Sequence, residues 1–298
     1  MTPSNFVNTR RLSSKPSSKR CSRISIASSS SSKSAQLFDE QLRRLCPTSH
    51  YHPKIVDPIR AIVNVLLPIF LQEQLKCTSN KTLKSILTNS IENYGVKTSQ
   101  IYQWLFNNQN TYLYKSLLGF FLMVGIGCRR DKKSAFSLFL AAAKKGYLIA
   151  QELVGDCYFF GIGTHENADL AFLWYSKCAE QGSGYGYHGL GICYEKGKGT
   201  ERFLPLAIEY YKISAMKGNV WGMIQLARRY QIGVGILKNI DKSIYWYQRA
   251  LEIGCEKAKN ELEKLMNSPL YSSKCHSSFS FRYNNFMSKN TIMHSNHE

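Results

Sequence analysis

The sequence lacks the features that mark a membrane-spanning, secreted or metal-binding protein. Its most apolar early stretch is interrupted by Arg60, Asn64 and Pro68 and is too short to cross a membrane. No apolar segment follows the basic start, so we expect no secretory signal peptide. The nine cysteines are odd in number and include no Cys-x-x-Cys pair, and no cysteine and histidine lie at zinc-ligand spacing. We therefore expect free thiols, no metal or other cofactor, no membrane span and a cytoplasmic location.

Acidic residues are missing from the first 34 positions. Residues 1–34 hold seven Lys and Arg side chains and thirteen serines. Such a composition buries too little apolar surface to offset the entropy of folding, so it predicts a disordered basic tail. An acid-free start rich in Arg and Ser is also typical of a mitochondrial transit peptide, but Pro3 and Pro16 disfavour the amphipathic helix that such a peptide needs. Ser13 follows Arg10-Arg11-Leu12 and is a candidate phosphorylation site for a basophilic kinase.

The formal charge of +19 does not by itself indicate nucleic-acid binding. Seven of these charges come from residues 1–34, three from 35–114, seven from 115–266 and two from 267–298. A nucleic-acid surface needs its charge gathered on one face of the folded part. Because acidic residues are spread through 115–266, we do not expect a nucleic-acid partner for this part. Binding through the basic tail is kept as an alternative.

A repeat with a period of 36 residues organises the second half of the chain. A Gly-x-Gly pair recurs four times, and further series of glycines, alanines and aromatic residues keep the same spacing. The paired glycines are Gly125 and Gly127, Gly161 and Gly163, Gly197 and Gly199, and Gly233 and Gly235. No insertion or deletion breaks the register, which is typical of a solenoid built from repeated helical units.

Each unit predicts two helices joined by a tight loop. Apolar residues at helical spacing fill the first helix, and the first glycine of the pair can end it in the left-handed conformation. Asp131, Asn167 and Asn239 are good N-caps for the second helix. Gly155 and Gly191 lie inside the first helix, where glycine costs about 1 kcal/mol relative to alanine. They therefore predict the close approach of an aromatic ring from a neighbouring helix.

The unit resembles the Sel1-like repeat, a relative of the tetratricopeptide repeat with a longer loop. The second unit carries the family pattern at Ala150, Val154, Gly155, Tyr158, Gly161, Gly163, Asn167, Ala171, Trp174, Tyr175, Ala179 and Gly182. The resemblance implies an all-α fold, a right-handed α-solenoid with a capping helix within 115–266. We place the four units at 115–149, 150–185, 186–221 and 222–257.

The flanking regions do not follow the repeat. Residues 35–114 are predicted to be a helical N-terminal region, and 267–298 a second disordered tail. The expected N-terminal helices are 37–45, 55–75, 82–92 and 99–106. This layout is similar to expanded fungal Sel1-repeat proteins, in which a helical region precedes the repeats. No kinase motif is present in the sequence.

No residue pattern indicates catalysis, so the sequence predicts that the protein is not an enzyme. The stretch from Gly184 to Gly189 fits G-x-G-x-x-G, but the fingerprint is meaningful only between a strand and a helix. Cys157 and Cys193 occupy equivalent positions in neighbouring units. Stacked helices lie about 8–10 Å apart, too far for a disulfide, so buried thiols are expected there.

The resemblance implies a scaffold or adaptor that binds a peptide or helix of a protein partner on its concave side. It further implies roles in signalling, with a kinase or a membrane-associated complex as partner, and no small-molecule substrate. Non-consensus positions on the first helices would make the contacts. These are Phe120, Asp156, Ile192 and Arg228 in one row, and Phe159, Glu195 and Gln231 in another. A hydrolase like some secreted cysteine-rich relatives is the other alternative, against which the unpaired cysteines argue.

Overall fold

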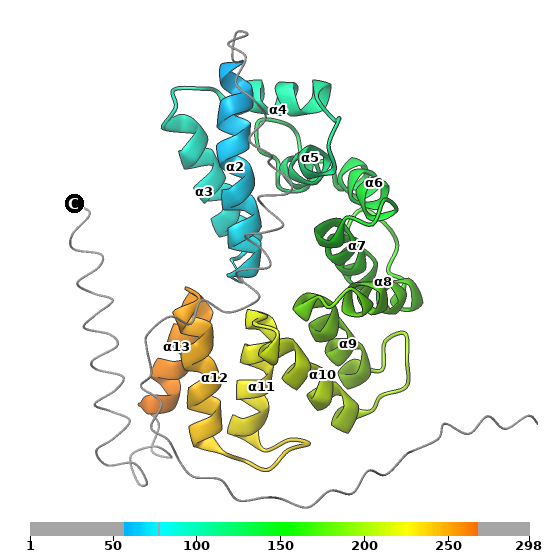
Figure 1. The fold of residues 1–298 in the computed structure, drawn as a ribbon, viewed down its shortest axis with the longest axis vertical. Coiled ribbons are helices and arrows are strands. Elements are labelled where there is room, and N and C mark those ends of the chain that lie inside the picture. Colours follow the sequence, from blue (N-terminus) through cyan, green and yellow to red (C-terminus); the bar gives the residue numbers. More distant parts are fainter. Residues whose placement is uncertain (1–56, 77, 268–298) are drawn as a thin grey trace, which may run out of the picture. The chain divides into compact units, whose positions relative to one another are not determined.

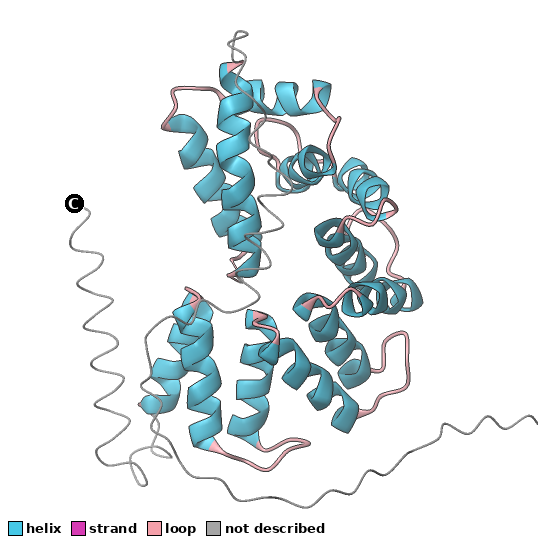
Figure 2. Ribbon diagram, viewed as in Figure 1, coloured by secondary structure: helices cyan, strands magenta, loops and turns pink. Residues whose placement is uncertain are grey.

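The computed structural model describes residues 57–76 and 78–267. All regular structure in these residues is α-helical, and no strand occurs among them (Figure 2). The two predicted tails, the expected helix at 37–45 and Ser13 lie outside the described residues, apart from Asn267. The all-α class predicted from the repeat is confirmed for the described part of the chain.

The four repeats fold as four helix pairs, which Figure 1 shows in succession. The pairs are α5 (Tyr112–Val124) with α6 (Lys132–Ala143), α7 (Leu148–Phe160) with α8 (Ala168–Glu180), α9 (Gly184–Lys196) with α10 (Leu204–Met216), and α11 (Val220–Ile232) with α12 (Ile240–Glu252). The helix α13 (Glu256–Met266) follows and packs against α12. The helices α7, α9 and α11 begin two residues before the unit boundaries predicted from the sequence.

The predicted caps set the ends of these helices. Asp131, Asn167 and Asn239 each accept a hydrogen bond from a backbone N–H in the first turn of the second helix, at 2.9 to 3.0 Å. Phe203 takes the equivalent place in the third repeat and provides no side-chain cap. The first helices end at glycines in the left-handed region, as predicted. These are Gly125, Gly161, Gly197 and Gly233.

Glycines inside the first helices make room for aromatic rings, as their sequence positions predicted. A Cβ at Gly155 would lie 2.6 Å from the ring of Tyr175, and one at Gly191 would lie 2.5 Å from the ring of Tyr211. The rings belong to the second helix of the same pair. A Cβ at Gly189 of α9 would also overlap the Tyr175 ring. Tyr175 is thus held between two successive first helices, which explains why small residues recur on both sides.

Each Gly-x-Gly loop packs onto the helix pair before it. The second glycine is the contact point, and in the second repeat a Cβ at Gly163 would overlap the carbonyl of Lys132, at the start of α6. Gly199 meets the backbone carbonyl of Ala168 of α8 in the same way, whereas Gly235 meets the side chains of Ile208 and Leu204 of α10. These contacts fix the register between neighbouring repeats, because only a residue without a side chain fits there.

The first Gly-x-Gly loop packs on the N-terminal helical region. This region consists of α2 (Pro58–Leu75), α3 (Asn80–Glu92) and α4 (Thr98–Asn107). Gly127 packs on the backbone of Thr98 and Ser99, at the start of α4. The helix α4 therefore takes the place that second helices take in later repeats, although the sequence spacing did not predict this. Phe70 of α2 packs against Phe120 of α5, with ring centroids 5.3 Å apart.

The first helices lie closer together than the second helices. The helix α9 contacts both α7 and α11, whereas second helices do not contact one another to the same extent. The stack of pairs therefore curves with its first helices on the inner side, as Figure 1 shows for α7, α9 and α11. No helix within 57–76 or 78–267 combines the length and apolar character that a bilayer crossing needs.

Candidate functional site

The side chains on the inner side of the first helices form the candidate site, which we call the inner face. Its members come from α7, α9, α11 and α13. They are Glu152, Asp156, Tyr185, His188, Ile192, Glu195, Trp221, Arg228, Gln231 and Lys257. Five of these were selected from the sequence, and the rest follow from their contacts.

Two residues predicted to contact a partner belong to the core instead. Phe120 is 0% exposed and Phe159 is 4% exposed. Phe120 packs against Phe70, and Phe159 lies beside Tyr175 with ring centroids 6.3 Å apart. Their non-consensus character therefore reflects packing, and neither side chain is offered at the surface.

The polar residues of the predicted rows accept hydrogen bonds from buried tyrosines. The hydroxyl of Tyr175 donates to Asp156 Oδ1 at 2.8 Å, and the hydroxyl of Tyr211 donates to Glu195 Oε2 at 2.6 Å. In the fourth repeat, Tyr247 donates to Gln231 Oε1 at 3.3 Å. A buried hydroxyl without a partner costs about 1–3 kcal/mol. Each of these inner-face positions therefore has a structural role that the sequence rows did not reveal.

The first repeat supports this reading of the rows. Its ring at the equivalent position is Phe139, which is fully buried and has no hydroxyl. The facing positions on α5 are Phe120 and Met123, which are apolar and buried. A polar acceptor thus occurs where the ring is tyrosine, and apolar residues occur where it is phenylalanine.

Charged residues link successive first helices along the inner face. Arg229 pairs with Glu195 of α9, with 2.6 Å between guanidinium and carboxylate. Arg228 lies 3.9 Å from Glu261 of α13 and its side chain is 43% exposed. In the predicted row, Ile192 lies between Asp156 and Arg228. Its side chain is partly buried and packs against the core of α8 and α9 as well as that of α10 to α13. Arg228 is accordingly the most accessible of the predicted contact residues for which an ion pair is seen.

A pair of carboxylates on α7 stands apart from these ion pairs. Glu152 and Asp156 are one helical turn apart, and both are only partly exposed. Glu152 Oε1 accepts a hydrogen bond from Ser183 at 2.5 Å, and Asp156 Oδ2 accepts one from Tyr185 at 2.6 Å. No Lys or Arg of the described chain forms an ion pair with either of them. Burial raises the pKa of Glu152 to about 7 and that of Asp156 to about 6.

The raised pKa of Glu152 predicts a stability that falls with rising pH. Its ordinary pKa is 4.5, so between pH 4.5 and about 7 the folded state binds more protons than the unfolded state. We expect Glu152→Gln to raise the free energy of unfolding by about 1–3 kcal/mol at pH 8 and to change it little at pH 4.5. Urea denaturation at both pH values measures this. Glu180→Gln, at an exposed site on α8, is the control, and an equal effect of both variants at pH 8 would contradict the prediction.

An aromatic row connects the acidic pair to α13. Tyr185, which donates to Asp156, has its ring centroid 5.9 Å from that of His188. His188 stacks on Trp221 at 6.1 Å, and Lys257 Nζ lies 5.0 Å from the centre of the Trp221 ring. Tyr185, Trp221 and Lys257 are 36 residues apart in sequence. The period could therefore have indicated this row, but the nearer of the two sequence rows was drawn seven residues, about two turns, further along the helix.

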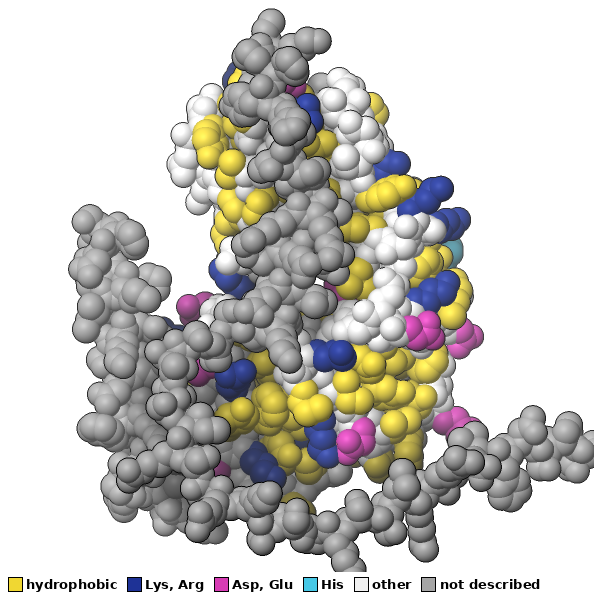
Figure 3. Space-filling view, viewed as in Figure 1, with side chains coloured by type: hydrophobic (Ala, Val, Ile, Leu, Met, Phe, Trp, Pro, Cys, Tyr) yellow, Lys and Arg dark blue, Asp and Glu magenta, His cyan; other side chains and the backbone are white. Residues whose placement is uncertain are grey.

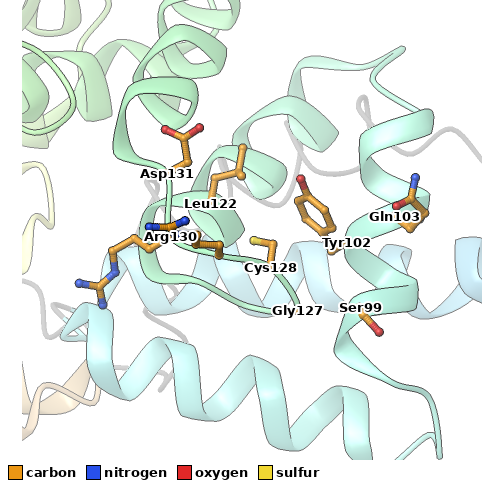
Figure 4. Close-up of a pocket in the computed structure, with 9 residues that line it drawn as sticks. Ser99, Tyr102, Gln103, Leu122, Gly127, Cys128, Arg130 and Asp131 are labelled. Carbon is orange, nitrogen blue, oxygen red and sulfur yellow. The ribbon is translucent and has the colours of Figure 1, made fainter.

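A surface pocket of about 730 Å³ lies outside the inner face, between α4 and the first Gly-x-Gly loop. In Figure 4, Tyr102 and Cys128 border the same space from these two elements. Burial raises the pKa of the Cys128 thiol, which disfavours the nucleophilic thiolate. Asp131 is engaged as the N-cap of α6, where hydrogen bonds from Ser134 lower its pKa. The lining therefore offers no activated nucleophile and base.

Burial also makes His188, Cys157 and Cys193 unsuited to proton transfer or nucleophilic attack. Burial lowers the pKa of His188 to about 3, so it is a neutral ring that does not take up a proton near pH 7. Cys157 and Cys193 are free thiols whose pKa burial raises to about 12. The G-x-G-x-x-G stretch forms the first half of α9, where Gly186 and Gly189 pack against α8. It is a helix-packing feature and does not form a phosphate loop.

Charge is not gathered into one patch on the face seen in Figure 3. There, basic side chains are interspersed with hydrophobic and acidic ones. The charged contacts of the repeats are mixed in the same way, as in the pair of Lys198 with Glu166. This distribution differs from the basic stripe of a nucleic-acid surface.

Comparison with known proteins agrees with the repeat geometry. The family model described as Sel1 repeat matches residues 116–147, 148–183, 184–219 and 222–255. A Sel1 repeat protein from Oxalobacter formigenes is 20% identical, with a TM-score of 0.55, over 87% of this chain and 98% of that chain. A protective antigen of uropathogenic Escherichia coli with an SLR fold is 24% identical, with a TM-score of 0.49, over 78% of this chain and 52% of that chain. No curated protein matches the sequence.

The left-handed glycines and the loop contacts recur once in each repeat. The segments that match the family model follow the same succession of units. At 20% identity, the likeness to the Oxalobacter formigenes protein shows the fold alone. The helix pairs, the 36-residue period and the matched segments all describe the same unit. The chain thus carries four Sel1 repeats, and they fold as an all-α solenoid of the tetratricopeptide type.

Proposed function

We propose that the protein is a non-catalytic scaffold that binds a segment of a protein partner on its inner face. The observation that carries the proposal is the continuity of this face. Side chains contact one another from α7 to α13, because the partly exposed rings of Tyr185 and Trp221 both pack on the buried His188 and the exposed Lys257 lies over Trp221. Extended surfaces of this kind on helical solenoids suit peptides and helices.

The chemistry of the inner face favours binding over turnover. Buried tyrosines donate hydrogen bonds to its carboxylates and its amide, and Glu195 also pairs with Arg229. Side chains fixed in this way form a rigid surface, which lowers the entropy lost on binding. The family resemblance further favours an adaptor in a signalling complex, with a kinase or a membrane-associated assembly as its partner.

Reversing the charge of Arg228 is expected to weaken capture of such a partner. The tagged full chain and its Arg228→Glu variant would be compared by quantitative affinity capture, with a loss of at least tenfold expected for the specific partner. Arg249→Glu on α12 is a matched control. Its side chain is 45% exposed against 43% for Arg228, and it also makes one long ion pair, at 3.5 Å to Glu252.

Two outcomes would contradict the proposal. Equal losses for Arg228→Glu and Arg249→Glu would show a general charge effect. Capture that is unchanged by Arg228→Glu and by a second inner-face substitution, Trp221→Ala, would place the partner elsewhere on the protein.

A further inference from the structure

The acidic pair on α7 is the least compensated charge of the inner face. The third acid of the inner face, Glu195, forms an ion pair with Arg229. Within the described residues, the donors to Glu152 and Asp156 are the hydroxyls of Ser183, Tyr175 and Tyr185. Two carboxylates one turn apart repel each other, and burial adds to the cost of charging them. A cation placed between them would remove both penalties.

Unpartnered polar atoms lie around the same surface. The hydroxyl of Tyr147 is buried without a hydrogen-bond partner among the described residues, close enough to Glu152 for that charge to raise its pKa. His188 is 6% exposed, and its Nε2 is likewise buried without a partner in the described chain. An unpaired buried polar group costs about 1–3 kcal/mol. Of these atoms, the Tyr147 hydroxyl lies near Glu152 and is available to a polar group of a ligand there.

The remainder of the surface limits what that group belongs to. Beside the pair stand the rings of Tyr185 and Trp221, and beyond them lie the cations Lys257 and Arg228. The inner face thus runs from the two acids on α7, through the aromatic rings on α9 and α11, to the single cation Lys257 at the start of α13. An anionic surface such as nucleic acid or a phospholipid bilayer is repelled at the α7 end. A short polypeptide segment with charges of both signs matches the whole row.

We propose that the inner face binds a partner-protein segment through one basic side chain, seated between Glu152 and Asp156. The N–H groups of the basic side chain donate hydrogen bonds to the two carboxylates, and the Tyr147 hydroxyl oxygen is a further acceptor. Apolar residues next to the basic residue pack on Tyr185 and Trp221. Acidic residues further along the segment face Lys257. This inference rests on the proposed scaffold function and adds the chemistry of its partner.

The pKa values of Glu152 and Asp156, about 7 and about 6, allow the proposed binding to be tested by changing the pH. The other nearby groups with shifted pKa values are Tyr147, Tyr175, Cys157 and Cys178, and burial raises the pKa of each, so all four stay neutral below pH 8. The acidic pair alone then changes charge between pH 8 and pH 5. A segment held by these carboxylates should therefore be released over this range. Ordinary surface carboxylates would hold it down to about pH 4.5.

The test uses a phage-displayed library of random twelve-residue peptides, selected on the full chain at pH 8. We expect one Lys or Arg at a fixed place in the enriched peptides, followed by apolar residues. Synthetic copies should bind the double variant Glu152→Gln with Asp156→Asn at least tenfold more weakly than the wild type. The matched control is Asp169→Asn with Glu180→Gln, which removes two exposed acids from α8 and should leave binding unchanged. Wild-type binding should also weaken at least tenfold from pH 8 to pH 5.

Each contrary result has its own meaning. Peptides that lose binding with Trp221→Ala or Arg228→Glu, but carry no fixed basic residue or bind the acid-free double variant equally well, overturn the basic-side-chain inference and leave the scaffold function standing. Selected peptides that ignore all of these substitutions overturn both. Circular dichroism and thermal unfolding of the variants check that they fold, which is expected because removing the two charges relieves a repulsion.

Discussion

Replacing Gly163 with alanine is expected to destabilise the repeats by about 3 kcal/mol or more. Two effects add at this position. The backbone has φ of +72°, a left-handed conformation that costs an L-residue about 1–2 kcal/mol. The new Cβ would also overlap the carbonyl of Lys132 at the start of α6. Because this carbonyl belongs to the helix backbone, it cannot move aside as a side chain could. Urea denaturation followed by circular dichroism measures the loss.

Gly146→Ala separates the two effects. Gly146 has φ of +85°, but nothing lies within 4 Å of its Cβ position. We expect this variant to lose only about 1–2 kcal/mol, which is the conformational cost alone. If both variants lost the same free energy, the contact between Gly163 and Lys132 would not hold the second repeat against the first. The loop would then be a connection without a packing role.

Truncating Tyr211 to alanine is expected to cost about 3–5 kcal/mol. Its ring is fully buried between α9 and α10 and fills the space that Gly191 leaves open. The change leaves a cavity and also removes the hydrogen bond from the tyrosine hydroxyl to Glu195. Because each repeat packs only on its neighbours, the third repeat should unfold first. Thermal unfolding and limited proteolysis both report this.

Tyr211→Phe keeps the ring and removes only the hydroxyl. We expect it to cost about 1.5–3 kcal/mol, the range for a hydrogen bond to a charged group. Glu195 retains its ion pair with Arg229, which places the expected loss toward the lower end. A phenylalanine variant as unstable as the alanine variant would show that the hydroxyl, and not the packing of the ring, sets the stability of this repeat.

Most of the repeat fold could be predicted because its signals are local. A glycine at the end of a helix, an asparagine before the next one and small residues at fixed spacing each specify one element of backbone. The caps at Asn167 and Asn239 and the left-handed turns at Gly161 and Gly233 form where the sequence placed them. The unit boundaries drawn from the sequence were approximate, and α7, α9 and α11 begin two residues before them.

The site could be predicted only in outline, because exposure depends on residues far away in the sequence. Phe120 occupies the same repeat position as Arg228, yet Phe70 of α2 covers it, and no repeat pattern includes α2. Asp156 fits a surface row equally well, but two tyrosines, 19 and 29 residues further on, donate to it. Glu152 was missed because nothing in its own unit marks it. Its importance comes from the Ser183 hydroxyl and the absence of an ion pair.

The sequence by itself determined the period, the helix pairs, and the caps and glycines at which helices of the repeats begin and end, since backbone conformation responds to neighbouring residues. The tertiary structure decided which polar side chains accept hydrogen bonds from tyrosine hydroxyls, and which acids have no ion pair within the described residues. It also decided that the first Gly-x-Gly loop packs on α4, although the sequence of α4 does not follow the 36-residue repeat. These features arise from packing between units, where burial changes the energy of a charge or a hydroxyl far more than sequence position does.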